Sequence, residues 1–315
     1  MTVDGSDDGT WRERLAGAEY AAAWALVRRM PAPLVARVFR AGADLAARRG
    51  GDGVGLLRAN LARVRPDASS AELDLLVRDG LRSYARYWHE VFRLPAMDPG
   101  DLHAAMTPHV YGIEPSLATL RAGRGVLYAL PHSGNWDVAG VWIVRELARM
   151  GLPAGITTVV QRLRPESLFR RFAAYRESLG FEIVTADDGR AAHRALTRRL
   201  AAGGVACLIA DRDLAGTGVD VRFCGEQARF PSGPARLAAL TGAALHPACA
   251  VFAGDAWGVH VGEEIPVPDR AAVGAGVQAL ADAFAAMIAE HPQDWHMLQP
   301  IWAADAAAEP VGSAG

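Results

Sequence analysis

The sequence predicts an α/β domain with a single twisted, mainly parallel sheet, covered by helices on both faces and preceded by a helical N-terminal cap. Two observations predict it. After residue 124, short apolar runs alternate with helical patterns of roughly 10 to 16 residues, which is typical of such a sheet. Before residue 95, only helical patterns occur. The 315 residues, 51% apolar and 22% charged, are enough to bury a sizeable core.

Residues 10–95 are expected to be helical because apolar residues recur there at helical spacing. The first residues in this pattern are Tyr20, Trp24, Val27, Leu34, Val38 and Leu45. Two prolines just after residue 30 divide this stretch into two helices, since proline interrupts a helix. Further helices are predicted over residues 56–64 and 70–94, and the expected N-cap of the second is Ser69 or Ser70.

Four apolar runs bounded by turn-forming residues are predicted as buried strands. They cover residues 126–130, 155–160, 181–186 and 205–211. Helical patterns follow the first three runs, over residues 136–150, 165–180 and 191–203. The remaining pattern predicts two helices, over residues 234–243 and 277–292, and between them a pair of strands, over 244–253 and 257–265.

No internal repeat and no sharp change of composition divides the chain, so we expect one domain. We place it at residues 11–304, with a helical cap over 11–98 and the α/β core over 99–304. Residues 1–10 are expected to be disordered and residues 305–315 to form a flexible tail.

Composition excludes several classes of protein. A net charge of −2 argues against a general nucleic-acid binder. The three cysteines, Cys207, Cys224 and Cys249, are widely spaced and odd in number, which indicates neither a disulfide framework nor a zinc site. The acidic, polar first ten residues are the opposite of a signal peptide, and no uninterrupted apolar run is long enough for a membrane span. We therefore expect a reduced, cytoplasmic setting.

Positive charge is concentrated near the N-terminus. Residues 12–65 contain eleven arginines against four carboxylates, and the chain has no lysine. A basic amphipathic helix with an aromatic residue is a candidate for contact with an anionic membrane surface. The alternative is an ordinary surface helix whose apolar stripe packs on the domain. Arginine also supplies forked donors that suit phosphate.

The run 126–130 leads into the sharpest motif, Pro131-His132-Ser133-Gly134-Asn135-Trp136-Asp137. His132 falls at the carboxyl edge of a strand, where ligands collect in α/β sheets, and Asp137 falls in the first turn of the next helix. We expect Asp137 to accept a hydrogen bond from the imidazole, which would leave the other ring nitrogen as a base. The alternative is a buried capping pair without chemistry.

Further segments accompany this motif: SYARYWHEVFRLP, AYRESLGFE, IADRDL, FCGEQARFPSGPARLAALTGAAL and HPQDWHMLQPIW. With PHSGNWD after an apolar strand, the chain resembles the bacterial lysophospholipid acyltransferase superfamily, in the branch of the lipid A lauroyl- and myristoyltransferases. Together the segments look like those of the actinobacterial phosphatidylinositol mannoside acyltransferases. The resemblance runs from about residue 20 to residue 302.

The resemblance implies acyl transfer from acyl-CoA, typically palmitoyl-CoA, to the 6-hydroxyl of a mannose on a phosphatidylinositol mannoside. It implies that His132 is the general base and that Asp137 orients it. It implies no permanently bound cofactor and no metal, with acyl-CoA as co-substrate. It further implies a peripheral enzyme on the cytoplasmic face of the plasma membrane, with residues 11–98 facing the lipid.

The other site residues carry over less directly. Asp211 matches a position where the family usually has Glu, the acidic partner of the histidine. Because Asp is shorter by one carbon–carbon bond, about 1.5 Å, its direct reach to His132 is left open, and a structural ion pair is the alternative. The resemblance places Arg176 of AYRES at the acyl-CoA site, although Arg176 is also placed to form an ordinary surface ion pair. Thr217, in the Gly-flanked loop GTG, is a candidate donor to the same ligand.

Two rival functions fit the same residues. In a thioesterase or lipid hydrolase, His132 would activate water in place of a sugar hydroxyl. A non-catalytic lipid-binding protein of the same fold is the other rival, motivated by Asp at position 211.

Overall fold

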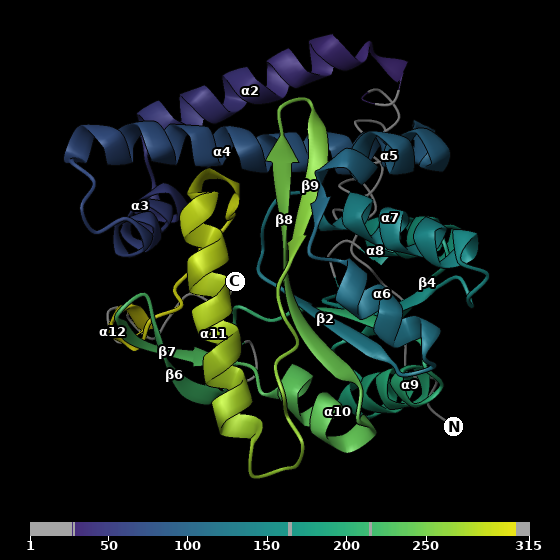
Figure 1. Cartoon of the computed structure of the whole chain (residues 1–315). Coiled ribbons are helices and arrows are strands. Elements are labelled where there is room, and N and C mark those ends of the chain that lie inside the picture. The colour runs from purple at the N-terminus through teal and green to yellow at the C-terminus, as the bar shows by residue number, and fades with distance from the viewer. Residues whose placement is uncertain (1–26, 28, 163–165, 214–215, 307–315) are drawn as a thin grey trace, which may run out of the picture.

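The computed structural model describes residues 27, 29–162, 166–213 and 216–306. It confirms the predicted α/β class, with a mainly parallel sheet between helices and a helical N-terminal region (Figure 1). The residues expected to be a disordered start lie outside the described residues, as do Tyr20, Trp24 and most of the expected tail.

The central sheet has seven strands in the order β1-β9-β8-β2-β5-β3-β4. Their bounds are β1 Val110–Tyr111, β2 Val126–Leu130, β3 Ile156–Val160, β4 Phe181–Thr185, β5 Val205–Ile209, β8 Ala244–Ala253 and β9 Ala256–Val261. Five strands run parallel to one another, in the order β8, β2, β5, β3 and β4. Strand β9 runs antiparallel to β8 and pairs in parallel with β1. The carboxyl ends of β2 and β5 therefore lie side by side.

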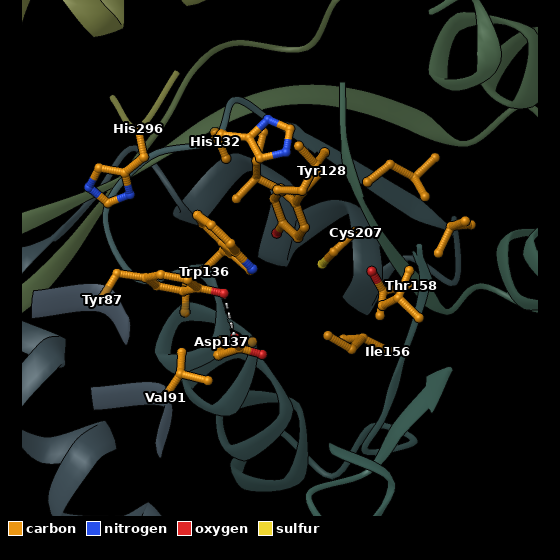
Figure 2. Close-up of a pocket in the computed structure, with 18 of the residues that line it drawn as sticks. Tyr87, Val91, Tyr128, His132, Trp136, Asp137, Ile156, Thr158, Cys207 and His296 are labelled. Carbon is orange, nitrogen blue, oxygen red and sulfur yellow. Dashed lines mark hydrogen bonds between the residues drawn. The ribbon is translucent and has the colours of Figure 1, made fainter. Parts of the chain in front are cut away.

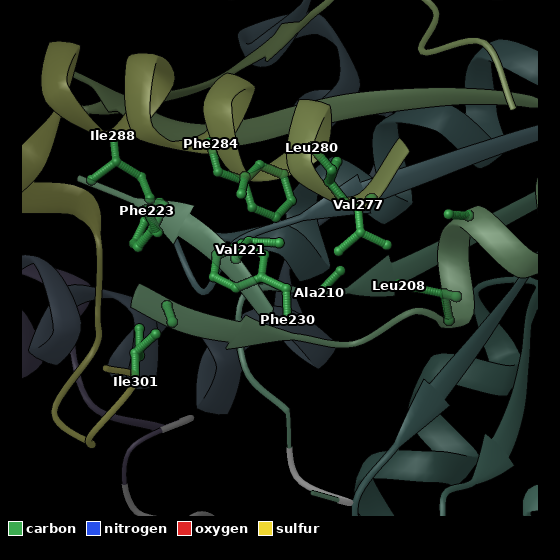
Figure 3. Close-up of a cluster of buried hydrophobic side chains, with 14 of the residues drawn as sticks. Leu208, Ala210, Val221, Phe223, Phe230, Val277, Leu280, Phe284, Ile288 and Ile301 are labelled. Carbon is green, nitrogen blue, oxygen red and sulfur yellow. The ribbon is translucent and has the colours of Figure 1, made fainter. Parts of the chain in front are cut away.

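A separate two-stranded hairpin, β6 (Val219–Phe223) and β7 (Glu226–Phe230), was not among the predicted strands. Only alternate residues of the hairpin are buried, so it contains no continuous apolar run. Phe223 and Phe230 pack against α11 (Val273–Glu290) in the core drawn in Figure 3. The hairpin thus extends the core without joining the main sheet.

Helices cover both faces of the sheet, and β2 shows how the two cores divide. Leu127 and Ala129 belong to one core and Tyr128 and Leu130 to the other, as expected for alternating side chains on a fully buried strand. The first core includes α9 (Gly189–Ala201), α10 (Gly233–Thr241) and α11. The second includes α5 (Pro99–Met106), α6 (Glu114–Arg121) and α7 (Trp136–Arg149).

The N-terminal helices are α2 (Ala32–Arg49), α3 (Asp52–Val64) and α4 (Ser70–Arg93). Ser69 is the N-cap of α4 and forms a capping box with Glu72, in agreement with one of the two caps expected. Helix α2 lies along α4 at the edge of the molecule (Figure 1) and buries Val35 and Ala43.

The remaining elements are short or peripheral to the sheet. They are α8 (Glu166–Ser178), α12 (Ala303–Ala306) and the 3₁₀ helices Leu94–Ala96, Thr107–His109 and Pro292–Asp294. Among the described residues, α11 is the one helix that is long and apolar enough to cross a membrane by length and composition. Val277, Leu280, Ala281 and Phe284 of α11 are fully buried in the core.

Candidate active site at the carboxyl ends of β2 and β5

His132 and Asp211 form a direct pair at the carboxyl edge of the sheet. Leu130 of β2 pairs with Ile209 of β5, so the residues two positions further along lie opposite each other. His132 Nδ1 lies 2.6 Å from Asp211 Oδ1, and the His132 backbone N–H donates to Oδ2 at 2.8 Å. Trp295 Nε1 also donates to Oδ2, at 3.0 Å. The shorter Asp side chain therefore reaches the imidazole without a bridging water.

The environment of this pair favours a proton on the imidazole and a charge on the carboxyl. Burial lowers the pKa of His132, but the charge and hydrogen bond of Asp211 raise it more, so it lies above its ordinary value of 6.5. Burial raises the pKa of Asp211, but His132 and the Trp295 donor lower it more, so it lies below its ordinary value. Because Nδ1 is bonded to Asp211, Nε2 is the nitrogen left to act on a substrate.

Asp137 does not orient His132, which corrects the expectation drawn from the motif. Its carboxylate accepts two hydrogen bonds from Arg176, from Nε at 2.6 Å and from Nη2 at 2.9 Å. The Tyr87 hydroxyl approaches the same carboxylate at 3.4 Å (Figure 2). Asp137 is buried in the first turn of α7, so it joins α7 to α8 and α4. The sequence correctly placed Asp137 in the first turn of α7, but the partner predicted for its carboxylate, His132, was wrong.

Arg176 is correspondingly buried, with 16% of its side chain exposed. Burial lowers its pKa, but the charge and hydrogen bonds of Asp137 raise it more, so the guanidinium stays charged. Arg176 is therefore not the solvated surface pair given as the alternative. The structure gives it a buried carboxylate partner, and it also lines the cavity beside His132.

Thr217 is not brought to His132. It is exposed on the loop before β6 and is not among the described residues that line the cavity beside His132. The structure thus gathers His132, Asp137, Asp211 and Arg176 around one cavity or directly behind it, and leaves Thr217 apart.

The turn between His132 and α7 depends on Gly134. Its φ of +54° is in the left-handed region, and a Cβ there would lie 2.5 Å from the backbone carbonyl carbon of Ala250. Asn135 is the N-cap of α7 and accepts from the Val138 N–H. The Asn135 side chain also donates to the buried Glu90 of α4 at 2.7 Å. These contacts fix the turn from both sides.

The C-terminal segment 291–297 is hydrogen-bonded to the backbone of the turn that carries His132, which the sequence did not predict. The His296 N–H donates to the His132 carbonyl at 2.7 Å, and the Gly134 N–H donates to the Asp294 carbonyl at 2.9 Å. The Asp294 side chain accepts from the Ser83 hydroxyl at 2.8 Å. No role at the site was predicted for this stretch. The HPQDWHM segment, already noted among the motifs, was the available signal.

A cavity of about 550 Å³ opens beside His132. Apolar and aromatic side chains from α4, α7 and the strands form most of its wall, and Figure 2 shows Val91, Tyr128, Ile156 and Cys207 around the space below His132. Burial raises the pKa of Cys207 to about 12, so it is an unreactive wall residue. The cavity has the size and character of a site for one largely apolar ligand.

Taken together, these residues form a base held by a carboxylate at the mouth of an apolar cavity. Such a base can take a proton from a hydroxyl or from water next to a bound apolar group. A family model described as bacterial lipid A biosynthesis acyltransferase matches residues 15–304. The chain belongs to this family.

Three curated relatives of this acyltransferase share one more specific name. A phosphatidylinositol mannoside acyltransferase of Mycolicibacterium smegmatis is 51% identical over 291 residues, covering 92% of each chain. Two proteins of the same name from Mycobacterium tuberculosis are 49% and 48% identical over 289 residues, covering 91% of this chain and 88% of theirs. The resemblance inferred from the motifs is thereby confirmed across nearly the whole acyltransferase.

Proposed function

We propose that this acyltransferase transfers a long-chain acyl group from acyl-CoA to the 6-hydroxyl of a mannose on a phosphatidylinositol mannoside. The expected acyl group is palmitoyl. The observation that carries the proposal is the His132–Asp211 pair, 2.6 Å apart, at the mouth of the apolar cavity. The relatives, which are phosphatidylinositol mannoside acyltransferases by name, supply the acceptor class.

In this mechanism His132 Nε2 takes the proton of the mannose hydroxyl as its oxygen attacks the thioester carbonyl. The carbon–sulfur bond breaks, the CoA thiolate leaves, and the imidazolium returns a proton to it. Asp211 stabilises that imidazolium and holds the ring by Nδ1. No acyl-enzyme is required, so both substrates bind before transfer.

The cavity supports the choice of an acyl donor. Its apolar wall suits a hydrocarbon chain, whose burial is favourable at roughly 0.8 kcal/mol per CH₂. Arg212, which follows Asp211, lines the same cavity. The hypothesis of a non-catalytic protein rested on the shorter Asp at position 211. The direct hydrogen bond between Asp211 and His132 argues against it.

The test uses radiolabelled palmitoyl-CoA with phosphatidylinositol mannosides in detergent micelles. Wild type is expected to label the glycolipid, and His132→Ala to lose about 10²- to 10⁴-fold of the rate, because a general base is removed. His193→Ala is the matched control, since His193 is exposed on α9. An unchanged rate in His132→Ala sinks the mechanism.

The same assay separates the rival functions. Free palmitate released equally fast with and without the glycolipid would favour a thioesterase or lipid hydrolase. Tight acyl-CoA binding without turnover on any acceptor would favour a lipid-binding protein.

We also infer that α2 docks on the cytoplasmic face of an anionic plasma membrane. Leu34, Val38 and Leu45 are 45%, 56% and 44% exposed, which is unusual for such side chains in one helix. These three residues of the apolar stripe are thus turned outward, while Val35 and Ala43 pack inward.

The charge of α2 agrees with an anionic lipid partner. Its exposed residues include Arg37, Arg40, Arg48 and Arg49, and its one acidic residue, Asp44, is paired with Arg82 at 2.5 Å. Co-sedimentation with vesicles containing phosphatidylinositol tests this at low salt. We expect a Leu34→Ser, Val38→Ser, Leu45→Ser triple variant to lose binding, and sedimentation equal to wild type would refute docking through α2.

A further inference from the structure

Three metal-ligating side chains converge away from the catalytic cavity. His260 of β9, Glu290 at the end of α11 and His291 just after it each offer one ligand atom within 4.8 Å of the other two. His260 Nδ1 lies 3.8 Å from Glu290 Oε2. None of the three is among the described residues that line the cavity beside His132. The cluster is therefore separate from the site that the proposed reaction uses.

The backbone around this cluster is well fixed. His260 pairs with Cys249 across β8 and with Tyr111 across β1, so it lies in the interior of a ladder. His291 ends α11, and its N–H donates to the Ile288 carbonyl at 3.1 Å. Helix α11 packs against β8, and Figure 1 shows it running beside the β8–β9 pair. Two rigid elements thus carry the three ligands.

The two imidazoles are in edge-to-face contact. The ring centroids of His260 and His291 are 5.1 Å apart and the ring planes are nearly perpendicular, at 89°, and each ring has a nitrogen within 4.8 Å of the other two possible ligand atoms. Tyr111 packs edge-on against His260 from another side, at 5.1 Å and 82°. The Glu290 side chain is 67% exposed, so its carboxylate can turn toward the imidazoles without disturbing the core.

We propose that His260, Glu290 and His291 bind one divalent cation of the zinc class, with water in the remaining position. Two imidazoles and one carboxylate are a donor set that zinc and its neighbouring transition metals accept, whereas magnesium and calcium prefer oxygen ligands. Metal–ligand bonds of about 2.0–2.2 Å require the ligand atoms to close by roughly 1 Å, which rotation of the side chains provides.

The cation would act as a clamp behind the active site. Val259 and Val261, on either side of His260, line the catalytic cavity, so β9 presents the cavity wall on one face and the metal ligand on the other. His291 begins the segment that leads to Trp295, the donor to Asp211. Bound metal would therefore hold the cavity wall to the segment that supports the His132–Asp211 pair, without touching substrate.

The experiment titrates untagged, chelator-treated protein with Zn²⁺ by calorimetry, and with Co²⁺ by absorption spectroscopy. We expect one ion per chain and a rise in melting temperature with Zn²⁺ but not with Mg²⁺. His291→Gln and Glu290→Gln should each raise the Kd for Zn²⁺ by about tenfold or more and abolish the rise in melting temperature. His193→Gln, at an exposed histidine on α9, is the matched control and should bind as wild type does.

Several outcomes would overturn the site. They are no saturable Zn²⁺ binding by wild type, unchanged binding in His291→Gln, or a cobalt–thiolate charge-transfer band, which would assign the ion to a cysteine. Because His260 is half-buried, His260→Asn is used only if its metal-free melting temperature equals that of wild type. The variants at the exposed Glu290 and the half-buried His291 carry the test if it does not.

Discussion

Two acid–base pairs lie near the same turn and each contributes to the lining of the same cavity, but they differ in which polar atoms their own contacts leave available. His132–Asp211 joins the ends of β2 and β5, and 36% of the His132 side chain is exposed at the cavity. Asp137–Arg176 joins α7 to α8, with 4% and 16% of the two side chains exposed. The first pair leaves one ring nitrogen for a substrate, whereas the second uses its charges on each other. Asp137 is close to His132 in the sequence, yet the hydrogen-bonding partner of the imidazole is the distant Asp211.

The largest effect is expected from breaking the first pair. Asp211→Asn removes the charge that stabilises the imidazolium, so acyl transfer should fall by about 10²- to 10⁴-fold. Initial rates with labelled acyl-CoA measure this, and circular dichroism shows whether the variant is folded. A rate within twofold of wild type would mean that Asp211 is not the partner of the base.

Breaking the second pair should affect stability first. Asp137→Ala leaves the buried Arg176 charge without a partner and should lower the free energy of unfolding by about 3–5 kcal/mol. The double variant Asp137→Ala, Arg176→Met removes both charges and should recover most of this loss. Urea unfolding measures both variants. A single variant as stable as the double would contradict the assignment of Asp137 to structural support.

The smallest effect is a shift in pH dependence. Since the base must be neutral, kcat/KM should rise with pH through a pKa above 6.5. In Asp211→Asn the raising charge is gone while burial still lowers the pKa of His132, so this limb should move to lower pH. Rates between about pH 5 and 9 test it, and an unmoved limb would assign the titration to another group.

The same pair has a defined effect on stability. Because the folded-state pKa of His132 is raised, its contribution is complete below the unfolded value and is lost as pH rises through the folded value. Because that of Asp211 is lowered, its contribution is present above the unfolded value and is lost as pH falls through the folded value.

Strands β2 and β5 were predictable because each is a continuous apolar run. The predicted run 126–130 coincides with β2, and 205–211 contains β5. The hairpin β6–β7 was not predicted, because it contains no continuous apolar run, although VDVRF and EQARF alternate as half-buried strands do. The proposed metal ligands were missed because 31 positions separate His291 from His260, and no local spacing connects them.

The α/β class, the position of His132 at a strand end and the family of the acyltransferase could be predicted from the amino-acid sequence alone. These follow from local periodicity and from motifs that are contiguous in the chain. That Asp211 rather than Asp137 holds the imidazole, and that Arg176 pairs with Asp137, became known from the folded arrangement. Side-chain pairing could not be predicted because it depends on which strands and helices are neighbours. The order β2–β5 brings residues 79 positions apart to within 2.6 Å, while five positions along the turn point Asp137 toward another helix.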